Sequence, residues 1–377
     1  MKILQLGKFY PIRGGVEKVM WDLTRGLSAR DVDCDMLCAC LSGETDPKDE
    51  ALRQDDGSLR FNDHGRVIRV KAISKKAATM ISPAMLSQLR RHRDDYDIIH
   101  VHHPDPMAAA ALRLSGFKGK VVLHWHSDIL SQKFLLALYR PLQDWLVRRA
   151  DVIVGTTPAY IKSSPWLKDV QSKCTYVPIG IEAINPDPDG AAAIRERFPG
   201  KTILFSLGRL VPYKGYPVLI RAMKYLPEKY QLLIGGTGPL RKELEELIDS
   251  EGLNGRVCLE GYIPDEKISS YYGACDIFVL SSIMKTEAFG IVQAEAMSCG
   301  KPVVATKIPG SGVSWVNEDG VSGRNVTPGD PALMAAAIED VAEHYRDFSE
   351  GARARFDELF CEEKMINSIL KIYEALV

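Results

Sequence analysis

The feature that most constrains this chain is a strand–loop–helix pattern that runs twice along its length. Short apolar segments alternate with amphipathic segments, first within residues 1–180 and again after residue 190. Between the two runs lies IEAINPDPDG (181–190), whose Pro, Asp and Gly residues are typical of a linker. This alternation predicts an α/β fold with two doubly wound, Rossmann-like domains that face each other across a cleft.

The apolar segments give the expected strands. In the first run they lie near residues 2–6, 32–40, 66–70, 97–103, 121–126, 151–157 and 174–180. In the second they lie near residues 202–210, 231–236, 256–263, 276–282 and 302–306. Helical periodicity is clearest over residues 16–29, 239–252 and 360–377. We therefore expect an N-terminal domain over 1–180, a C-terminal domain over 181–358 and a separate last helix within 359–377.

Length and composition fit a soluble two-domain protein. The chain has 377 residues, and no run approaches the roughly 18 apolar residues of a spanning helix. The start, MKILQLGKFY, lacks the apolar run of a signal peptide. The eight cysteines contain no C-x-x-C pair, and three of them alternate in VDCDMLCAC (32–40). These features predict reduced thiols and a cytoplasmic location.

The net charge of −1 hides an asymmetry between the two halves. Residues 1–180 carry 27 Lys and Arg against 20 Asp and Glu (+7), and residues 181–377 carry 21 against 29 (−8). A basic first half favours an acidic partner such as an anionic membrane, for which the inner face of the plasma membrane is the expected place. The alternative is ordinary scatter of charge between domains. RVIRVKAISKK (66–76) and LRRHR (89–93) are the candidate contact segments, whereas the apolar stretch 134–150 is expected to be a buried helix.

Two loops are candidates for binding a diphosphate. SLGRLVPYKG (206–215) places Arg209 and Lys214 after a strand and before a helix, where cations and free backbone N–H groups attract anions. GGTGP (235–239) follows the next strand, and its Gly238 would let the backbone approach a ligand. Surface cations and a tight turn are the alternatives. GGVEK (14–18) is a second glycine-rich helix start, in the other domain.

The segment EAFGIVQAE (287–295) places two glutamates eight residues apart, before GKPVVAT. In one continuous helix they would lie about 12 Å apart along the axis and about 80° apart around it. We expect Phe289 and Gly290 to turn the chain into a helix that starts near Ile291, with Glu287 before it and Glu295 inside it. Such carboxylates suit the hydroxyl groups of two parts of one long ligand, such as a sugar and a ribose.

Five histidines crowd the ends of two expected strands, in DIIHVHH and VVLHWH. The repeated H-x-H spacing is compatible with a metal site, but side chains that border a sugar site fit better, and we expect no metal. His126 is the main functional candidate among them, with Asp128 of HWHSD second.

Seven motifs, in their order along the chain, resemble those of the family-4 retaining glycosyltransferases of GT-B fold. They are GGVEK, HWHSD, GRLVPYKG, GGTGP, E-x7-E, GKPVVAT and EDGVSGRNVTPGDP. The resemblance covers nearly the whole chain. It implies an N-terminal domain that binds the acceptor, a C-terminal domain that binds the nucleotide sugar, and a last helix that crosses back to the N-terminal domain.

The resemblance also implies roles for single residues. Arg209 and Lys214 would bind the diphosphate and stabilise the leaving group, Glu295 would bind the ribose, and Glu287 would bind the sugar beside the reacting carbon. His126 would lie near that carbon. The remaining residues implied at the donor site are Gly15, Gly238, Tyr262, Ile263, Phe289, Gly290 and Ile291.

The implied reaction transfers a sugar with retention from a UDP- or GDP-sugar to an acceptor hydroxyl, without a metal or cofactor. The acceptor would be a glycan or a lipid-linked sugar in the assembly of a cell-surface polysaccharide or glycolipid. A nucleotide-sugar epimerase of the same fold would need acid/base residues for elimination. A non-catalytic nucleotide-sugar-binding protein is not favoured, because the charged residues Arg209, Lys214, Glu287 and Glu295 are all present. A nicotinamide dehydrogenase is not favoured either, because KFYPIRGG stands where G-x-G-x-x-G is expected.

Overall fold

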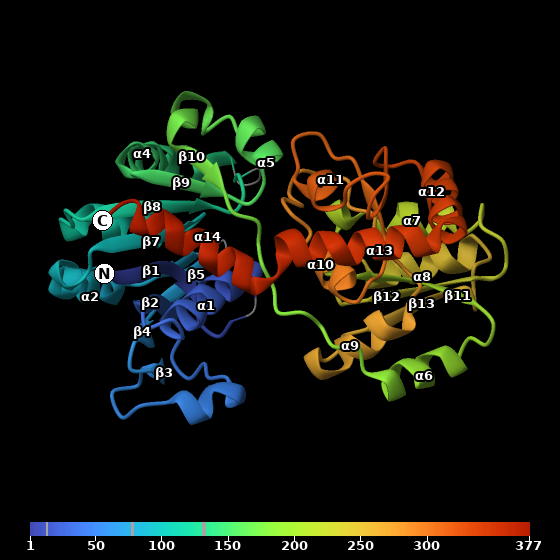
Figure 1. The fold of residues 1–377 in the computed structure, drawn as a ribbon, viewed down its shortest axis with the longest axis horizontal. Helices are drawn as coiled ribbons and strands as arrows, with labels where there is room; N and C mark the ends of the chain where they lie inside the picture. The colour runs from blue at the N-terminus through green and yellow to red at the C-terminus, as the bar shows by residue number, and fades with distance from the viewer. Residues whose placement is uncertain (13, 77–78, 130–132) are drawn as a thin grey trace. The chain divides into compact units, whose positions relative to one another are not determined.

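A computed structural model describes residues 1–12, 14–76, 79–129 and 133–377 (Figure 1). The chain divides into two compact units: unit 1 comprises residues 1–180 and 362–377, and unit 2 comprises residues 181–361. Residues 359–361 thus lie in unit 2, not with the last helix. The N–H of Ile181 donates to the carbonyl of Phe360 at 2.8 Å, and the ring of Phe360 packs edge-on against Phe289 and Trp315.

Unit 1 is built on parallel strands with helices between them. Its strands are β1 (Lys2–Phe9), β2 (Asp33–Cys40), β3 (Leu59–Asn62), β4 (Gly65–Lys71), β5 (Ser74–Lys76), β6 (Thr79–Ile81), β7 (Ile98–His103), β8 (Lys120–Trp125), β9 (Val152–Gly155) and β10 (Cys174–Tyr176). Its helices are α1 (Gly15–Ser28), α2 (Pro83–His92), α3 (Pro106–Ser115), α4 (Lys133–Arg149), α5 (Pro158–Ser163) and α14 (Glu362–Glu374), with 3-10 turns at Pro47–Leu52, Arg93–Asp95 and Lys168–Lys173.

The main sheet of unit 1 has eight strands in the order β10-β9-β8-β7-β1-β2-β4-β3. Only β3 pairs antiparallel, with β4. Register places Gln5 of β1 beside His100 of β7, and His102 of β7 beside His124 of β8. Because side chains alternate between the faces of a strand, these four residues project from one face of the sheet.

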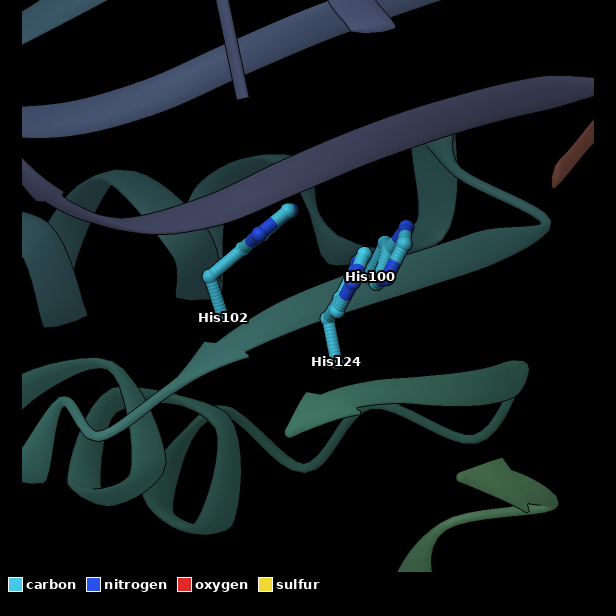
Figure 2. Close-up of side chains that lie close together, drawn as sticks. All are labelled: His100, His102 and His124. Atoms are coloured by element: carbon cyan, nitrogen blue, oxygen red, sulfur yellow. The ribbon is translucent and has the colours of Figure 1, made fainter. Parts of the chain in front are cut away.

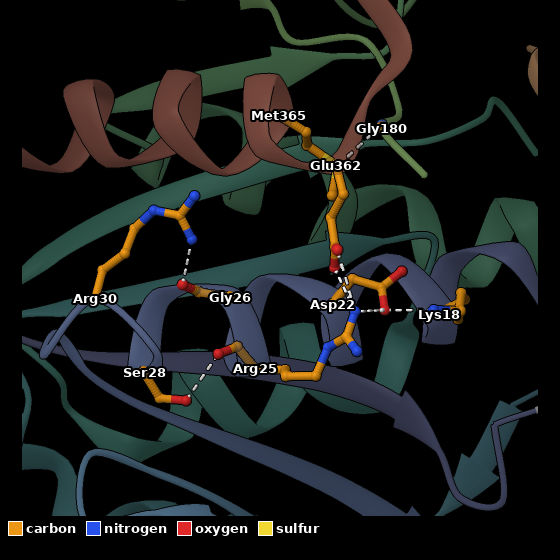
Figure 3. A network of polar contacts seen from close by, with 9 residues as sticks. All are labelled: Lys18, Asp22, Arg25, Gly26, Ser28, Arg30, Gly180, Glu362 and Met365. Carbon is orange, nitrogen blue, oxygen red and sulfur yellow. Dashed lines mark hydrogen bonds and ion pairs between the residues drawn. The ribbon is translucent and has the colours of Figure 1, made fainter. Parts of the chain in front are cut away.

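Helix α14 packs beside α1, although the two are more than 300 residues apart in sequence (Figure 1). Arg25 of α1 forms a bidentate pair with Glu362 of α14, at 2.8 and 3.1 Å (Figure 3). The sulfur of Met365 accepts from the N–H of Gly180 at 3.3 Å. A Cβ atom on Gly26 of α1 would lie 2.1 Å from Cδ1 of Ile366 of α14. The close approach of the two helices therefore depends on a glycine at position 26.

Unit 2 repeats the alternation with an all-parallel sheet. Its strands are β11 (Thr202–Leu207), β12 (Tyr230–Gly235), β13 (Val257–Gly261), β14 (Ile277–Leu280), β15 (Val303–Thr306) and β16 (Gly323–Val326). Its helices are α6 (Pro188–Glu196), α7 (Tyr216–Ala222), α8 (Arg241–Ser250), α9 (Asp265–Ala274), α10 (Ile291–Ser298), α11 (Val313–Val316), α12 (Pro331–Glu343) and α13 (Tyr345–Arg355), with a 3-10 turn at Pro212–Lys214 and a π turn at Phe356–Phe360.

The six strands of unit 2 lie in the order β13-β12-β11-β14-β15-β16. Leu204, Leu232, Val279 and Val304, from four of these strands, are fully buried in one apolar cluster with residues of α7, α8 and α12. Runs of Val, Ile and Leu are expected in strands that are covered on both faces, as in this sheet. The α/β fold predicted from the alternation is therefore confirmed in both units.

The structure departs from the sequence prediction at short edge elements. Strands β3, β5, β6 and β16 were not expected, because each has only three or four residues and too short a pattern to detect. The stretch expected to be a buried helix forms α4, but it is amphipathic: Tyr139 and Leu146 are buried, and Leu138 is 67% exposed. In the part of the chain that the structure describes, no helix is long and apolar enough to cross a membrane.

The cysteines are as expected, but the cations of the basic segments are not all available to a partner. Cys34 and Cys38 are buried on β2, and all eight cysteines are free thiols. In the basic segments, Arg69 donates to the carbonyl of Gly57 and Arg93 to that of Ser115. Several of these cations are thus occupied by the chain itself.

Candidate functional site

The strand order of unit 2 reverses between β11 and β14, which are neighbours in the sheet. The loops that leave the carboxyl ends of strands diverge at such a reversal and form the usual binding crevice of a parallel sheet. Lys214 follows β11, and Glu287 follows β14. Nζ of Lys214 lies 2.6 Å from Oε2 of Glu287. Two residues predicted from separate motifs therefore meet in one ion pair at the reversal.

Glu287 is held by its own surroundings as well as by Lys214. The hydroxyl of Ser282 donates to the same Oε2 atom at 2.9 Å, and the hydroxyl of Ser311 donates to the Glu287 carbonyl. The side chains of Lys214 and Glu287 are 10% and 12% exposed, so the pair is screened less than a surface ion pair. Both side-chain contacts end on Oε2, and within the described residues none reaches Oε1. Oε1 can therefore accept a further hydrogen bond.

The loop that carries Arg209 and Lys214 is fixed on the loop that follows β14. Gly215 has φ = 67°, and a Cβ atom there would lie 2.1 Å from the carbonyl oxygen of Ser281. The Ser281 hydroxyl donates in turn to the Lys214 carbonyl at 2.9 Å. Arg209 lies on the same loop but is exposed. One cation is therefore fixed in position, and the other is exposed to the solvent.

The second glutamate lies where the spacing predicts. Helix α10 begins at Ile291, after Gly290 in the left-handed conformation (φ = 72°) and the buried Phe289. Glu295 lies inside the helix and accepts from the Tyr272 hydroxyl at 2.6 Å. Burial, with the charge of Glu295 adding to it, raises the pKa of Tyr272 well above its usual range. Tyr272 therefore stays a neutral donor that orients the carboxylate.

The glycine loop 235–239 packs closely against the loop that follows β11. A Cβ atom on Gly236 would lie 2.0 Å from the carbonyl of Gly208, and one on Gly238 would lie 2.4 Å from that of Leu210. These glycines therefore allow the loop after β12 to pack on the loop that carries Arg209. Their immediate role is contact between two loops.

Tyr262 and Ile263, which follow β13, differ in exposure. The ring of Tyr262 is 71% exposed, and Ile263 is 6% exposed. Cδ1 of Ile263 lies 2.4 Å from the position of a Cβ atom on Gly235, so Ile263 packs into the glycine loop. Of this predicted pair, only Tyr262 presents its side chain to the solvent.

Unit 1 has its own strand reversal, between β1 and β7. Lys8 is the second-last residue of β1. It has φ = 60° and is 9% exposed, and its Nζ donates to the carbonyl of Pro104 at 2.5 Å. Its N–H donates to Asp105, which also caps α3 by accepting from Met107 and Ala108. Burial lowers the pKa of Lys8. Gly15, the first residue of α1, is exposed, and a Cβ atom there would meet nothing within 4 Å.

Five histidines of unit 1, in and just after β7 and β8, are buried. His100, His102 and His103 are fully buried, and His124 and His126 are 1% and 5% exposed. Burial lowers the pKa of each ring, in His124 to about 3. All five are therefore neutral at pH 7, and each ring has one N–H donor and one acceptor nitrogen.

Ring nitrogens of His100, His102 and His124 lie within 4.8 Å of one another, close enough for a common metal ion (Figure 2). However, the three rings are stacked, with angles of 7°, 26° and 27° between their planes and centroids 4.6–5.3 Å apart. An imidazole binds a metal through a lone pair in the plane of its ring, so a shared ion would have to lie in all three planes. The stacked arrangement does not fit this requirement.

His126 and Asp128 follow β8, but they differ in what they can still bind. Oδ1 of Asp128 accepts from Nε1 of Trp125 at 2.9 Å and from the Ser164 hydroxyl at 2.7 Å, so this carboxylate supports the fold. Nδ1 of His126 is buried and has no hydrogen-bond partner in the described part of the chain. His126 is therefore the candidate with a ring nitrogen that can still form a hydrogen bond to a ligand.

Sequence reasoning missed the residues that position the candidates. Ser282 and Ser311 hold Glu287, Tyr272 holds Glu295, and Lys8 marks the reversal in unit 1. The one available signal was the pair Ser281–Ser282, which are polar residues directly after a buried strand. Tyr272 lies on α9, and nothing in the sequence indicates that it reaches Glu295.

Two parallel α/β units, with charged residues at the reversal of the second, define the class of GT-B glycosyltransferases. Residues 13–183 match the family described as glycosyltransferase family 4, and residues 192–355 match glycosyl transferases group 1. The chain belongs to family 4 of the glycosyltransferases, since a full-length relative supports the same assignment. That relative, O-antigen chain mannosyltransferase C of Escherichia coli, is 31% identical over 384 positions, which cover 100% of this chain and 99% of the relative.

A second relative and two solved structures agree with this assignment. The D-rhamnosyltransferase WbpZ of Pseudomonas aeruginosa is 29% identical, over 96% of this chain and 92% of the relative. HepE of Anabaena, solved with UDP, has a TM-score of 0.78 at 22% identity and full coverage of both chains. Sucrose-phosphate synthase of Thermosynechococcus elongatus has a TM-score of 0.77 at 23% identity, with 100% and 99% coverage. The two structures share the fold.

Proposed function

We propose that this glycosyltransferase transfers a hexose, with retention, from a nucleoside diphosphate sugar to an acceptor hydroxyl. The observation that carries the proposal is the Lys214–Glu287 pair at the strand reversal of unit 2. The ammonium group of Lys214 has three donors, of which one is directed to Glu287. The others, with the exposed guanidinium of Arg209, would bind the diphosphate oxygens. Glu287 Oε1 and Glu295 would accept from hydroxyls of the sugar and the ribose.

In the proposed reaction, the bond between the anomeric carbon and the phosphate oxygen breaks, and a bond forms to the acceptor oxygen on the same face. The acceptor proton passes to the departing phosphate oxygen, and the nucleoside diphosphate leaves. Lys214 and Arg209 stabilise the negative charge that develops there, which is the contribution a divalent cation makes elsewhere. The proposed transfer therefore needs neither a metal nor a covalent intermediate.

The proposed setting is the synthesis of a surface polysaccharide or glycolipid. The full-length relative is named for O-antigen chain assembly, and another, from Mycobacterium leprae, is named a phosphatidyl-myo-inositol mannosyltransferase. Mannose is therefore the first sugar to test. The alternative donors are UDP-sugars, such as the UDP-glucose bound to HepE.

Contact with an anionic membrane is a further part of the proposal. Lys71 is exposed, and Ile73, two residues further on, is 72% exposed. This pairing of charge and apolar surface is typical of peripheral binding. Flotation with anionic and with zwitterionic vesicles tests it. Ile73→Ser should weaken binding to the anionic vesicles, and equal binding to both kinds would contradict the proposal.

A thermal-shift screen in EDTA against GDP, UDP, ADP and their sugar conjugates tests the donor site. A ligand that binds the folded state raises the midpoint of unfolding, and we expect GDP and GDP-mannose to do so. Proton NMR of the product then gives its anomeric configuration. Inversion, or a requirement for a divalent metal, would overturn the proposed mechanism. A donor that changes configuration without any acceptor would instead identify an epimerase.

A further inference from the structure

A chain of hydrogen bonds connects the C-terminal helix to His126 through the interior of unit 1. The amide nitrogen of Gln5 lies 2.9 Å from the Tyr373 hydroxyl of α14, and its oxygen lies 2.8 Å from Nε2 of His102. Nδ1 of His102 lies 2.9 Å from Nε2 of His126. A branch runs from the Tyr373 hydroxyl to Nδ1 of His100, at 2.5 Å. All these side chains are buried.

The direction of these bonds follows from the amide of Gln5. Its oxygen can only accept, so Nε2 of His102 carries the proton. Because His102 is neutral, its Nδ1 is then an acceptor, and Nε2 of His126 must donate to it. His126 is neutral as well, so its Nδ1 has no proton. This atom has no partner in the part of the chain that the structure describes.

The orientation of the Gln5 amide is set by its neighbours on the side away from His102. The amide nitrogen donates to the Tyr373 hydroxyl at 2.9 Å and also lies 3.7 Å from the Cys34 sulfur. The amide oxygen therefore faces Nε2 of His102, at 2.8 Å.

We propose that Tyr373, Gln5 and His102 are positioning residues that hold His126 as its Nε2–H tautomer, so that Nδ1 is a hydrogen-bond acceptor at the active site. The inference rests on the proposed function and extends it: this acceptor would bind a hydroxyl of the transferred sugar. The chain of bonds makes the protonation of His126 depend on a tyrosine that belongs to the C-terminal helix. A histidine in this state orients a hydroxyl and does not donate a proton to it.

The test is the tautomer of His126 in the full-length protein labelled with 15N-histidine. Two-bond proton–nitrogen correlation spectra at pH 7.5 distinguish Nε2–H from Nδ1–H, and the His126→Gln variant assigns the signals. We expect a single Nε2–H form in the wild type. Gln5→Met removes the donor and the acceptor of the Gln5 amide with little change in side-chain volume. It should produce a mixture of His126 tautomers. Tyr373→Phe should produce a smaller change in the same direction.

The matched control is Gln143→Met, because Gln143 is also buried in unit 1 but has no hydrogen-bond partner among the residues that the structure describes. It should leave the His126 signals unchanged. In an assay of GDP release from GDP-mannose, Gln5→Met should lower kcat about five- to tenfold, equivalent to about one hydrogen bond, with KM little changed. An Nδ1–H tautomer in the wild type, or an unchanged tautomer in Gln5→Met, would overturn the inference.

Turnover by His126→Ala separates this inference from the proposed function. Loss of turnover together with the Nε2–H tautomer supports both. Full turnover with the Nε2–H tautomer in the wild type would overturn the role of His126 in sugar transfer and leave the tautomer assignment standing.

Discussion

The strand reversals of the two units each bring a buried lysine against a neighbouring loop, but the partners differ. In unit 1, Lys8, near the end of β1, contacts the carbonyl of Pro104, and the carboxylate beside it, Asp105, already caps α3. In unit 2, Lys214 contacts Glu287, and no side chain among the described residues reaches the second oxygen of this carboxylate. A similar charge at a similar place in the fold therefore stabilises the fold in unit 1 and remains available for a ligand in unit 2.

The units also differ in their buried titratable groups and in their continuity. Unit 1 buries five neutral histidines and is completed by α14, whereas the one histidine of unit 2, His344, is exposed. Unit 2 is one continuous segment. These differences predict different responses to acid, to loss of charge and to disturbance of helix packing.

The largest expected effect is a loss of stability of unit 1 in mild acid. A histidine whose pKa is lowered in the folded state stabilises the protein fully above its unfolded pKa, near 6.5, and this contribution is lost as the pH falls below that value. Between pH 7 and 5.5 each buried histidine should cost about 1.2 kcal/mol, or up to about 6 kcal/mol for five. Hydrogen exchange, corrected for intrinsic rates, should show loss of protection in β7 and β8 before β11 and β14.

His124→Leu sharpens this prediction. Both ring nitrogens of His124 lack a hydrogen-bond partner within the described residues, so a leucine removes no hydrogen bond. Between pH 7 and 5.5 the variant should lose about 1.2 kcal/mol less of its free energy of unfolding than the wild type, because one titrating group is gone. Equal acid sensitivity of the two units would break the comparison.

The next effect concerns the lysine of unit 2. Lys214→Ala should lower turnover about 100- to 1,000-fold, because it removes a charge next to the departing diphosphate. Lys224→Ala is the control, since Lys224 pairs with Glu251 at the surface. GDP release from GDP-mannose measures turnover, and a circular-dichroism melt shows whether the fold is retained. Near-normal turnover of Lys214→Ala would mean that the lysine at the reversal of unit 2 does not serve the reaction.

A smaller effect is expected where α14 packs on α1. Gly26→Ala places a methyl group against Ile366 and should destabilise unit 1 by about 1–3 kcal/mol through overpacking. Ile366→Val in the same chain should restore part of the loss, because it removes the Cδ1 atom. Chemical denaturation measures both. If the single variant were as stable as the wild type, the two helices would not be packed as closely as described.

The smallest effect is expected for the lysine of unit 1. Lys8→Met should lower the free energy of unfolding by about 1–2 kcal/mol, because the Pro104 carbonyl loses its donor. Turnover should change far less than in Lys214→Ala. If Lys8→Met lost turnover to the same extent, the lysines of both reversals would serve the reaction.

How much could be read from the sequence depends on whether a contact is local. The start of α10 at Ile291 and the placement of Glu287 and Glu295 on either side of it follow from a single short segment, and the prediction was correct. The pairing of Lys214 with Glu287 joins residues 73 positions apart through strand order, which the pattern of strands alone does not fix. The stacking of four histidines, His100, His102, His124 and His126, likewise depends on the register of β7 against β8.

The glycines show a different limit. A glycine loop at a strand end predicts a ligand near Gly238, and the structure adds a second reason for this glycine, because the backbone of Leu210 lies against it. A sequence shows that a glycine is present, not which neighbour requires it. The secondary structure and the motif positions were therefore predictable, but the partners of the key side chains were not.

The placement of α14 in unit 1 has a consequence for biosynthesis. Residues 1–180 leave the ribosome first, yet the face of their sheet that carries Gln5 and His100 is covered by a tyrosine at position 373. Domains generally fold in the order of synthesis, but here all of residues 181–361 must be made before the first domain can be completed. During translation this face of the sheet therefore lacks the cover of α14 for the time needed to synthesise a whole further domain.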